Sequence, residues 1–168
     1  MEPEHTLPLE GDDTADDISF SPDGRWLAAA GQRGRVHVFD TSTWRAAYPP
    51  VRANSDHALQ VEWTADSRTI VSSGADATVS LLDVDRGLRR ASPLPAADTA
   101  GIGYTHLVPG IDGDVIALSG ERAGRRYPMS PSRWLAEACA VAGRDLTEAE
   151  WASYLPGLPW QATCSDLS

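Results

Sequence analysis

The sequence predicts a mainly β protein in which about three antiparallel units, each of four short strands, precede a small C-terminal α-helical cap. Residues 18–40 align without a gap to residues 61–83, at an offset of 43 positions. In both stretches, turn-forming residues separate short segments in which apolar and polar residues alternate. This alternation is the pattern of half-buried strands. After residue 130 the apolar spacing changes to that of an amphipathic helix.

Each strand and turn of the first unit has a local reason. Ile18 to Phe20 alternates, and Ser21 to Gly24 reads Ser-Pro-Asp-Gly, in which proline sets φ and glycine tolerates the positive φ of a tight turn. An inner strand of small residues, a second turn and another alternating strand follow. These are Trp26–Ala30, Gly31–Gly34 and Arg35–Asp40, with a fourth, outer strand expected around Ala46–Arg52.

The later units repeat this plan. Ile18 matches Val61, and Phe20 matches Trp63. A weaker third copy places Ile116 at the position of Leu27. A Pro-apolar dipeptide introduces each unit: Pro8-Leu9, Pro50-Val51 and Pro93-Leu94. The predicted division is an acidic arm that could include an outer strand, three repeats, and a cap with its tail: residues 1–17, then 18–52, 61–95 and 104–130, then 131–168.

A repeat of about 43 residues with a Ser-Pro-Asp-Gly turn and a strand that ends in Phe39-Asp40 resembles the WD-repeat β-propeller family. The resemblance covers roughly residues 5–130, although the closing pairs Leu82-Asp83 and Tyr127-Pro128 lack the tryptophan of the family signature. It implies propeller-type blades, that is, a partial WD-repeat propeller. The alternative fold is a generic β-sandwich.

The family often carries a buried His–Ser–Asp–Trp network within a blade. Ser72 and Asp76 fit the serine and aspartate positions, His57 is the candidate histidine, and Leu82 replaces the tryptophan. In the first unit Arg33 stands where Asp76 does, so that network cannot form there. We expect these side chains to tie a loop to a strand rather than to form a hydrolase triad.

Three blades are fewer than the four to eight that propellers use, and they would leave sheet edges open. Two explanations remain. The chain could be the C-terminal part of a longer propeller, or it could close through a second copy or a separate propeller half, since two three-blade halves would make a six-blade ring. The segment from His5 to Leu9 resembles the outer strand of a preceding blade.

Two capped helices are expected after residue 130. Ser130-Pro131 begins the first and Gly143 ends it, while Thr147 and Glu150 form a capping box for the second. One face of the first helix gathers Trp134, Leu135, Ala138, Cys139, Val141 and Ala142. The segment resembles the terminal extension of actinobacterial WD-repeat proteins. This implies a structural cap with Trp134, Trp151, Tyr154 and Trp160 as packing anchors, or alternatively a binding groove that they line.

The two cysteines, Cys139 and Cys164, could form a disulfide if the tail folds back over the first helix. The N-terminus shows no secretory signal and no stretch is apolar enough to span a membrane, so a reducing cytoplasm is the expected location. Two free thiols are therefore favoured over a bridge.

Composition and motifs argue against catalysis. Lys+Arg is 14 against Asp+Glu 24, a net charge of −10 that repels nucleic-acid backbones. The sequence shows no phosphate-binding loop, metal-ligand spacing or nucleophile–base pair, so we expect no enzyme activity, cofactor or metal. The acids of residues 2–17 are expected to form a solvated arm.

The expected function is that of a non-catalytic scaffold or sensor for a protein or peptide partner in a bacterial signalling or regulatory system. Propeller ligands usually meet loops at one rim, here Gly11–Asp17, Asn54–Ala58 and the adjoining turns. The candidate contact residues are Arg33, His57, Asp76 and Arg122. The alternative is an assembly or closure module whose open edges pair with a second chain, or the remnant of a longer WD-repeat protein.

Overall fold

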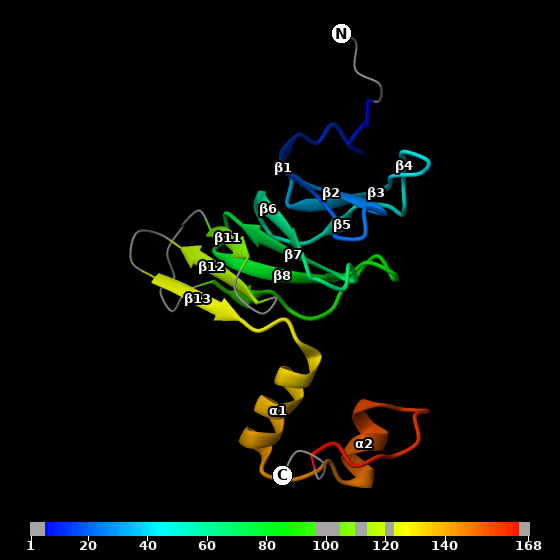
Figure 1. Ribbon diagram of the computed structural model, residues 1–168, viewed down its shortest axis with the longest axis vertical. Helices are drawn as coiled ribbons and strands as arrows, with labels where there is room; N and C mark the ends of the chain where they lie inside the picture. Colours follow the sequence, from blue (N-terminus) through cyan, green and yellow to red (C-terminus); the bar gives the residue numbers. More distant parts are fainter. Residues whose placement is uncertain (1–5, 97–104, 110–113, 120–122, 165–168) are drawn as a thin grey trace. The chain divides into compact units, whose positions relative to one another are not determined.

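The computed structural model, shown in Figure 1, describes residues 6–96, 105–109, 114–119 and 123–164. The chain forms two compact units, residues 1–127 and 128–168. The regular elements among the described residues of the first unit are all strands, and those of the second are two helices, so the predicted mainly β fold with a short helical C-terminal part is confirmed.

The first unit contains three antiparallel sheets in chain order. The first sheet consists of β1 (Ala15–Phe20), β2 (Trp26–Gly31), β3 (Arg35–Asp40), β4 (Arg45–Ala46) and β5 (Val51–Arg52). The second consists of β6 (Ala58–Trp63), β7 (Thr69–Gly74), β8 (Thr78–Asp83), β9 (Leu88–Arg89) and β10 (Leu94–Pro95). The third consists of β11 (Thr105–Pro109), β12 (Val115–Ser119) and β13 (Ala123–Tyr127). The single outer strand expected around Ala46–Arg52 is instead split into β4 and β5, which both pair with β3.

The sequence offset of 43 is also an offset of backbone register. Phe20 lies opposite Leu27 as Trp63 lies opposite Ile70. The strand β1 shifts register between Ala15 and Asp17, and β6 does so at the matching place. The first two sheets are therefore copies of one blade-like unit.

The third sheet keeps this plan with a different alignment. Leu27 lies opposite Phe39, and Val115 lies opposite Tyr127. With Tyr127 at the position of Phe39, as the sequence predicts, this pairing puts Val115 rather than Ile116 in the place of Leu27. Burial supports this alignment, since Leu27 and Val115 are both buried whereas Ile116 is half-buried.

The core lies between the first two sheets. Small residues on β2 let the second sheet approach closely, and larger aliphatic side chains on β6, β7 and β8 fill the space. The buried cluster comprises Ala28, Ala30, Val36, Val38, Ala53, Ala58, Val61, Ile70, Leu82 and Val84. A hydrogen bond also joins the sheets, because Trp63 Nε1 donates to the Ser19 carbonyl at 3.0 Å.

The expectation of a solvated acidic arm is wrong for part of residues 2–17. The first strand already begins at Ala15, and the Asp13 side chain is fully buried against His37. Asp17 accepts a hydrogen bond from the Val61 amide at 3.0 Å. These carboxylates find hydrogen-bond donors on neighbouring strands, so they lie in the structure rather than in solvent.

In the second unit, α1 spans Pro131–Ala142 and α2 spans Glu148–Tyr154. Gly143 closes α1 with a φ of 65°, and the Thr147–Glu150 capping box is present, as predicted. On the face of α1 that gathers apolar residues, Val141 is 90% exposed and Leu135 is also exposed. No helix in the described residues is long and apolar enough to cross a membrane.

Among the four expected aromatic anchors, Trp151 is the buried one, while Trp134 is half-buried and both Tyr154 and Trp160 are exposed. The indole nitrogens still fasten the tail. Trp151 donates to the Leu158 carbonyl and Trp160 donates to the Leu146 carbonyl, each at 3.0 Å. Trp151 and Trp160 thus hold the tail through hydrogen bonds of their indole nitrogens.

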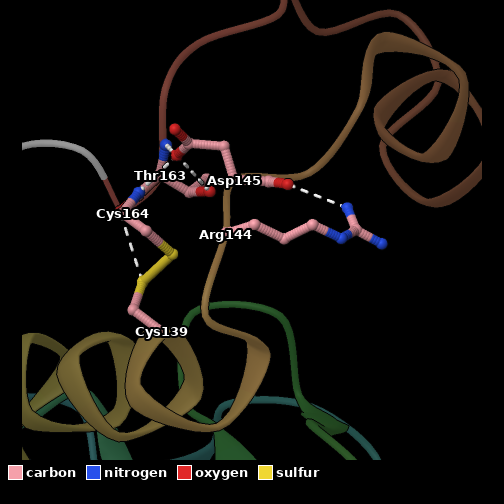
Figure 2. The surroundings of a disulfide bond; sticks show 5 residues. All are labelled: Cys139, Arg144, Asp145, Thr163 and Cys164. Carbon is pink, nitrogen blue, oxygen red and sulfur yellow. Dashed lines mark hydrogen bonds between the residues drawn. A yellow bond between two sulfur atoms is a disulfide. The ribbon is translucent and has the colours of Figure 1, made fainter.

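A disulfide joins Cys139 to Cys164, in place of the two free thiols that the sequence favoured. Figure 2 shows the reason for their proximity: one carboxylate oxygen of Asp145 accepts from the backbone amides of Thr163 and Cys164, each at 2.6 Å. The tail therefore returns to α1, and the two Cα atoms lie 5.4 Å apart.

Candidate protein-binding site

Four loops meet at one end of the first two sheets. They are the segments before β1 and β6 and the turns β2–β3 and β7–β8. Gln32 N donates to the Thr14 carbonyl at 2.9 Å, Asn54 N donates to the Gly34 carbonyl at 3.1 Å, and Ala75 N donates to the His57 carbonyl at 2.9 Å. The loops that the sequence predicted as a partner-binding rim are thus bonded to one another.

Asp76 is the centre of the rim in the second sheet. One carboxylate oxygen accepts from the amide and hydroxyl of Ser55, at 2.6 and 2.7 Å, and the other accepts from the amide and hydroxyl of Thr78, at 3.1 and 2.6 Å. Burial alone would raise the pKa of Asp76, but these hydrogen bonds outweigh it and the pKa lies below its usual value. Asp76 is therefore a structural carboxylate.

Asn54 takes the place in this network for which the sequence suggested His57. Its amide nitrogen lies 3.4 Å from Asp76, and its carbonyl accepts from the Ser72 hydroxyl at 2.9 Å. The proposed pair of Ser72 and Asp76 thus meets through Asn54. His57 instead lies half exposed, with its ring nitrogens 4.0 Å from Asp16 and 3.9 Å from Asp56.

The first sheet has a network of its own, which the sequence did not predict. Asp13 lies 3.2 Å from His37 Nε2 and accepts from the amides of Arg33 and Thr14 at 3.0 Å. Burial opposes ionisation, yet the bond with His37 and the two amides bring the pKa of Asp13 below its usual value. A Cβ on Gly31 would lie 2.3 Å from the Asp13 carboxylate, so this approach requires glycine.

The other residues predicted to contact a partner lie outside the hydrogen-bond network of Asp76 or outside the described residues. Arg33 takes part in the first network through its backbone amide, and its side chain belongs to an exposed residue of the β2–β3 turn. Arg122 lies outside the described residues. Neither Arg33 nor His57 shares the hydrogen-bond network of Asp76 in the described part of the chain.

Beside Asp76 a hollow of about 310 Å³ opens toward solvent. Its lining consists of Arg52, Asn54, Ser55, Asp76, Thr78, Arg89 and Pro93. Arg52 donates to the Ser55 carbonyl at 2.9 Å. Sequence reasoning missed Arg52 and Arg89 because it considered only turns. The sequence feature that could have indicated them is an arginine close to each of the two later Pro-apolar dipeptides, Pro50-Val51 and Pro93-Leu94.

Comparison with known proteins adds a family match to part of the chain. Residues 1–40 match the family described as WD domain, G-beta repeat. The matched stretch contains β1–β3 and the Asp13 network, so the blade-like form of the first sheet and the family match agree.

Three relatives share such regions with the chain. Cilia- and flagella-associated protein 251 of Tetrahymena thermophila is 33% identical over 73 residues, 40% of this chain and 7% of that protein. Protein LST8 homolog of Drosophila melanogaster is 29% identical over 82 residues, 45% of this chain and 26% of that protein. WD repeat-containing protein 1 of Xenopus tropicalis is 33% identical over 69 residues, 40% of this chain and 11% of that protein. The matched WD-repeat region thus spans about a quarter or less of each relative.

Proposed function

We propose that this chain is a non-catalytic protein-interaction scaffold or sensor module of a bacterial signalling or regulatory system. In this proposal it is the C-terminal portion of an actinobacterial-type WD-repeat protein, and it binds a protein or peptide partner. The observation that carries the proposal is a rim of loops held by the carboxylates of Asp13 and Asp76 beside an arginine-lined hollow.

The rim is suited to binding because it is already ordered. Asp13 and Asp76 satisfy amides from both neighbouring loops, so these loops lose little conformational entropy when a partner docks. The acids are occupied internally, whereas Arg52 and Arg89 are exposed at the hollow. A carboxylate of the partner can therefore accept from guanidinium groups.

The predicted rim residues surround this contact. Arg33 and His57 stand on loops that hydrogen-bond to those of the hollow, and both are exposed. We place them at the border of the interface, where charged contacts guide association more than they strengthen it. Arg122 stays a proposed contact of the third unit.

The test compares matched peptides. A peptide array presents each sequence with a central Asp or Glu and again with Asn or Gln, and the purified chain is the probe. We expect the acidic members to bind better, and we expect Arg52→Ala with Arg89→Ala to abolish the difference. Arg45→Ala on β4 is the control because Arg45 is exposed and absent from the hollow's lining. An unchanged array for the double variant contradicts the site.

A second function is favoured by a separate observation. Ile18 and Phe20 on β1 are more than half exposed, although apolar residues of this kind are normally covered by a neighbour. This supports an assembly or closure module whose incomplete propeller pairs with a second chain, or belongs to a longer WD-repeat protein.

A further inference from the structure

The exposed face of β1 has a covered counterpart within the same chain. Val61 and Trp63 on β6 pack against the first sheet, where Val61 is fully buried and Trp63 Nε1 donates to the Ser19 carbonyl. Ile18 and Phe20 occupy the same register positions one repeat earlier, yet they are 60% and 56% exposed. The face that docks one sheet onto the preceding one is therefore bare on β1.

The Pro-apolar dipeptides point to the same missing neighbour. Val51 pairs with Val36 of β3, and Leu94 pairs with Val79 of β8. Each dipeptide thus adds an outer strand to the sheet that precedes it. Leu9, in the first dipeptide, belongs to no strand in the described residues. Its expected partner is the third strand of another sheet.

The third sheet offers what these two features require. Within the described residues it has three strands and no outer strand beside β13. Its buried face contains Leu107, whose amide donates to Gln60 of the second sheet at 2.7 Å. On the opposite face Val108 and Leu118 are 41% and 42% exposed. This apolar face corresponds to the one that the first sheet presents to Val61.

A recurring hydrogen bond crosses the sheet interfaces. Asp17 Oδ2 accepts from the Val61 amide at 3.0 Å, and Gln60 Oε1 accepts from the Leu107 amide at 2.7 Å. Each acceptor stands directly before the residue at the donor position of its own strand. Gln60 stands directly before Val61 on β6, as Asp17 stands directly before Ile18 on β1. On β11 that acceptor position is His106, which is exposed and whose ring nitrogen can accept a hydrogen bond.

We propose that two copies of this chain join head to tail and reciprocally, so that β1 of each covers the third sheet of the other. Ile18 and Phe20 pack on Val108 and Leu118, His106 accepts from the Ile18 amide, and the Pro8-Leu9 segment adds a fourth strand to β13. The closed pair contains six sheets, within the range that forms a ring. This deepens the second proposed function by naming the partner and its residues.

The register of the added strand is defined by the two internal precedents. Arg52 lies opposite Arg35, and Pro95 lies opposite Thr78. Because Tyr127 takes the position of Phe39, the corresponding pair between copies is Glu10 with Ala123. Paired residues of neighbouring strands have Cα atoms about 4.5–5.5 Å apart, which a disulfide can bridge.

The first test is the molar mass in solution, by light scattering across a dilution series. The unaltered chain is expected to be a dimer, and Ile18→Asp with Phe20→Asp is expected to halve the mass. Leu88→Asp is the control, because Leu88 is 60% exposed on β9, outside the proposed interface. Circular dichroism checks that each variant remains folded. A monomeric unaltered chain, or a folded double variant that stays dimeric, overturns the proposal.

The second test is covalent trapping under oxidation. Glu10→Cys with Ala123→Cys is expected to give a dimer that reduction reverses, whereas the control pair Glu10→Cys with Arg89→Cys stays monomeric. An internally bridged monomer or a ladder of longer oligomers overturns the closed pair. Arg52→Ala with Arg89→Ala leaves the dimer intact, so failure of the arginine-lined site and failure of self-association are distinguishable.

Discussion

The first two sheets share one register but hold their loops in opposite ways. In the second sheet the carboxylate comes from the β7–β8 turn, where Asp76 reaches the amide of Ser55 in the loop before β6. In the first sheet the carboxylate comes from the loop, where Asp13 reaches the amide of Arg33 in the β2–β3 turn. The backbone amides at this junction thus require a carboxylate acceptor, but not from a particular segment.

Removing each carboxylate in turn should distinguish the two arrangements. We expect the larger loss in the free energy of unfolding when the carboxylate of the second sheet is removed. Asp76→Ala leaves the amides and hydroxyls of Ser55 and Thr78 without this acceptor and removes one of the acceptors of the buried Asn54, so we expect a loss of about 3 kcal/mol in the free energy of unfolding. Asp13→Ala should cost about 2 kcal/mol, because the exposed loop residues can turn to water while His37 loses its partner.

Urea unfolding measures both losses. The matched control is Asp56→Ala, whose side chain is 61% exposed and bonds its neighbour's amide, with an expected change below about 0.5 kcal/mol. A loss for Asp13→Ala that exceeds the loss for Asp76→Ala would reverse the ranking of the two networks.

Acid should weaken both networks. The pKa values of Asp13 and Asp76 lie below the ordinary 3.8, because hydrogen bonds to the charged forms outweigh burial. Their contribution to stability is therefore complete above pH 3.8, the unfolded value, and is lost as the pH falls through the lower folded values. Urea unfolding at a series of pH values measures this loss.

The matched variant is Asp13→Asn with Asp76→Asn, for which we expect a shallower fall in stability on acidification. Some slope should remain, since the pKa values of Asp23 and Asp66 are also lowered. An unchanged acid profile would show that neither Asp13 nor Asp76 contributes to it.

The smallest expected effect tests the contact between the two sheets. Trp63→Phe keeps a smaller aromatic ring but removes the hydrogen bond to the Ser19 carbonyl, so we expect a loss of about 1 kcal/mol. Phe20→Trp is the reciprocal control, because it places an indole at the matching position, which is 56% exposed in the single chain, so a change near zero is expected at concentrations where the chain is monomeric. Thermal unfolding compares the two, and equal losses would contradict the asymmetry of the faces.

Much of the fold could be predicted because its signals are local. The Ser-Pro-Asp-Gly turn, the alternation of β3 and the caps of both helices depend on neighbouring residues. The candidate site was harder to predict. Asp76 and Ser72 were identified, but His57 was assigned a place that Asn54 holds, because a choice between two polar residues three positions apart depends on the path of the loop.

The amino-acid sequence by itself determined the repeat, its offset, the turn positions and the helix ends, since periodicity and turn chemistry act over a few residues. The tertiary structure alone decided which side chains meet: Asp13 with His37, Cys139 with Cys164, and Arg52 with Arg89 at one hollow. These partners are far apart in sequence, and burial with hydrogen bonding, which decides between them, exists only after the strands and the tail have packed.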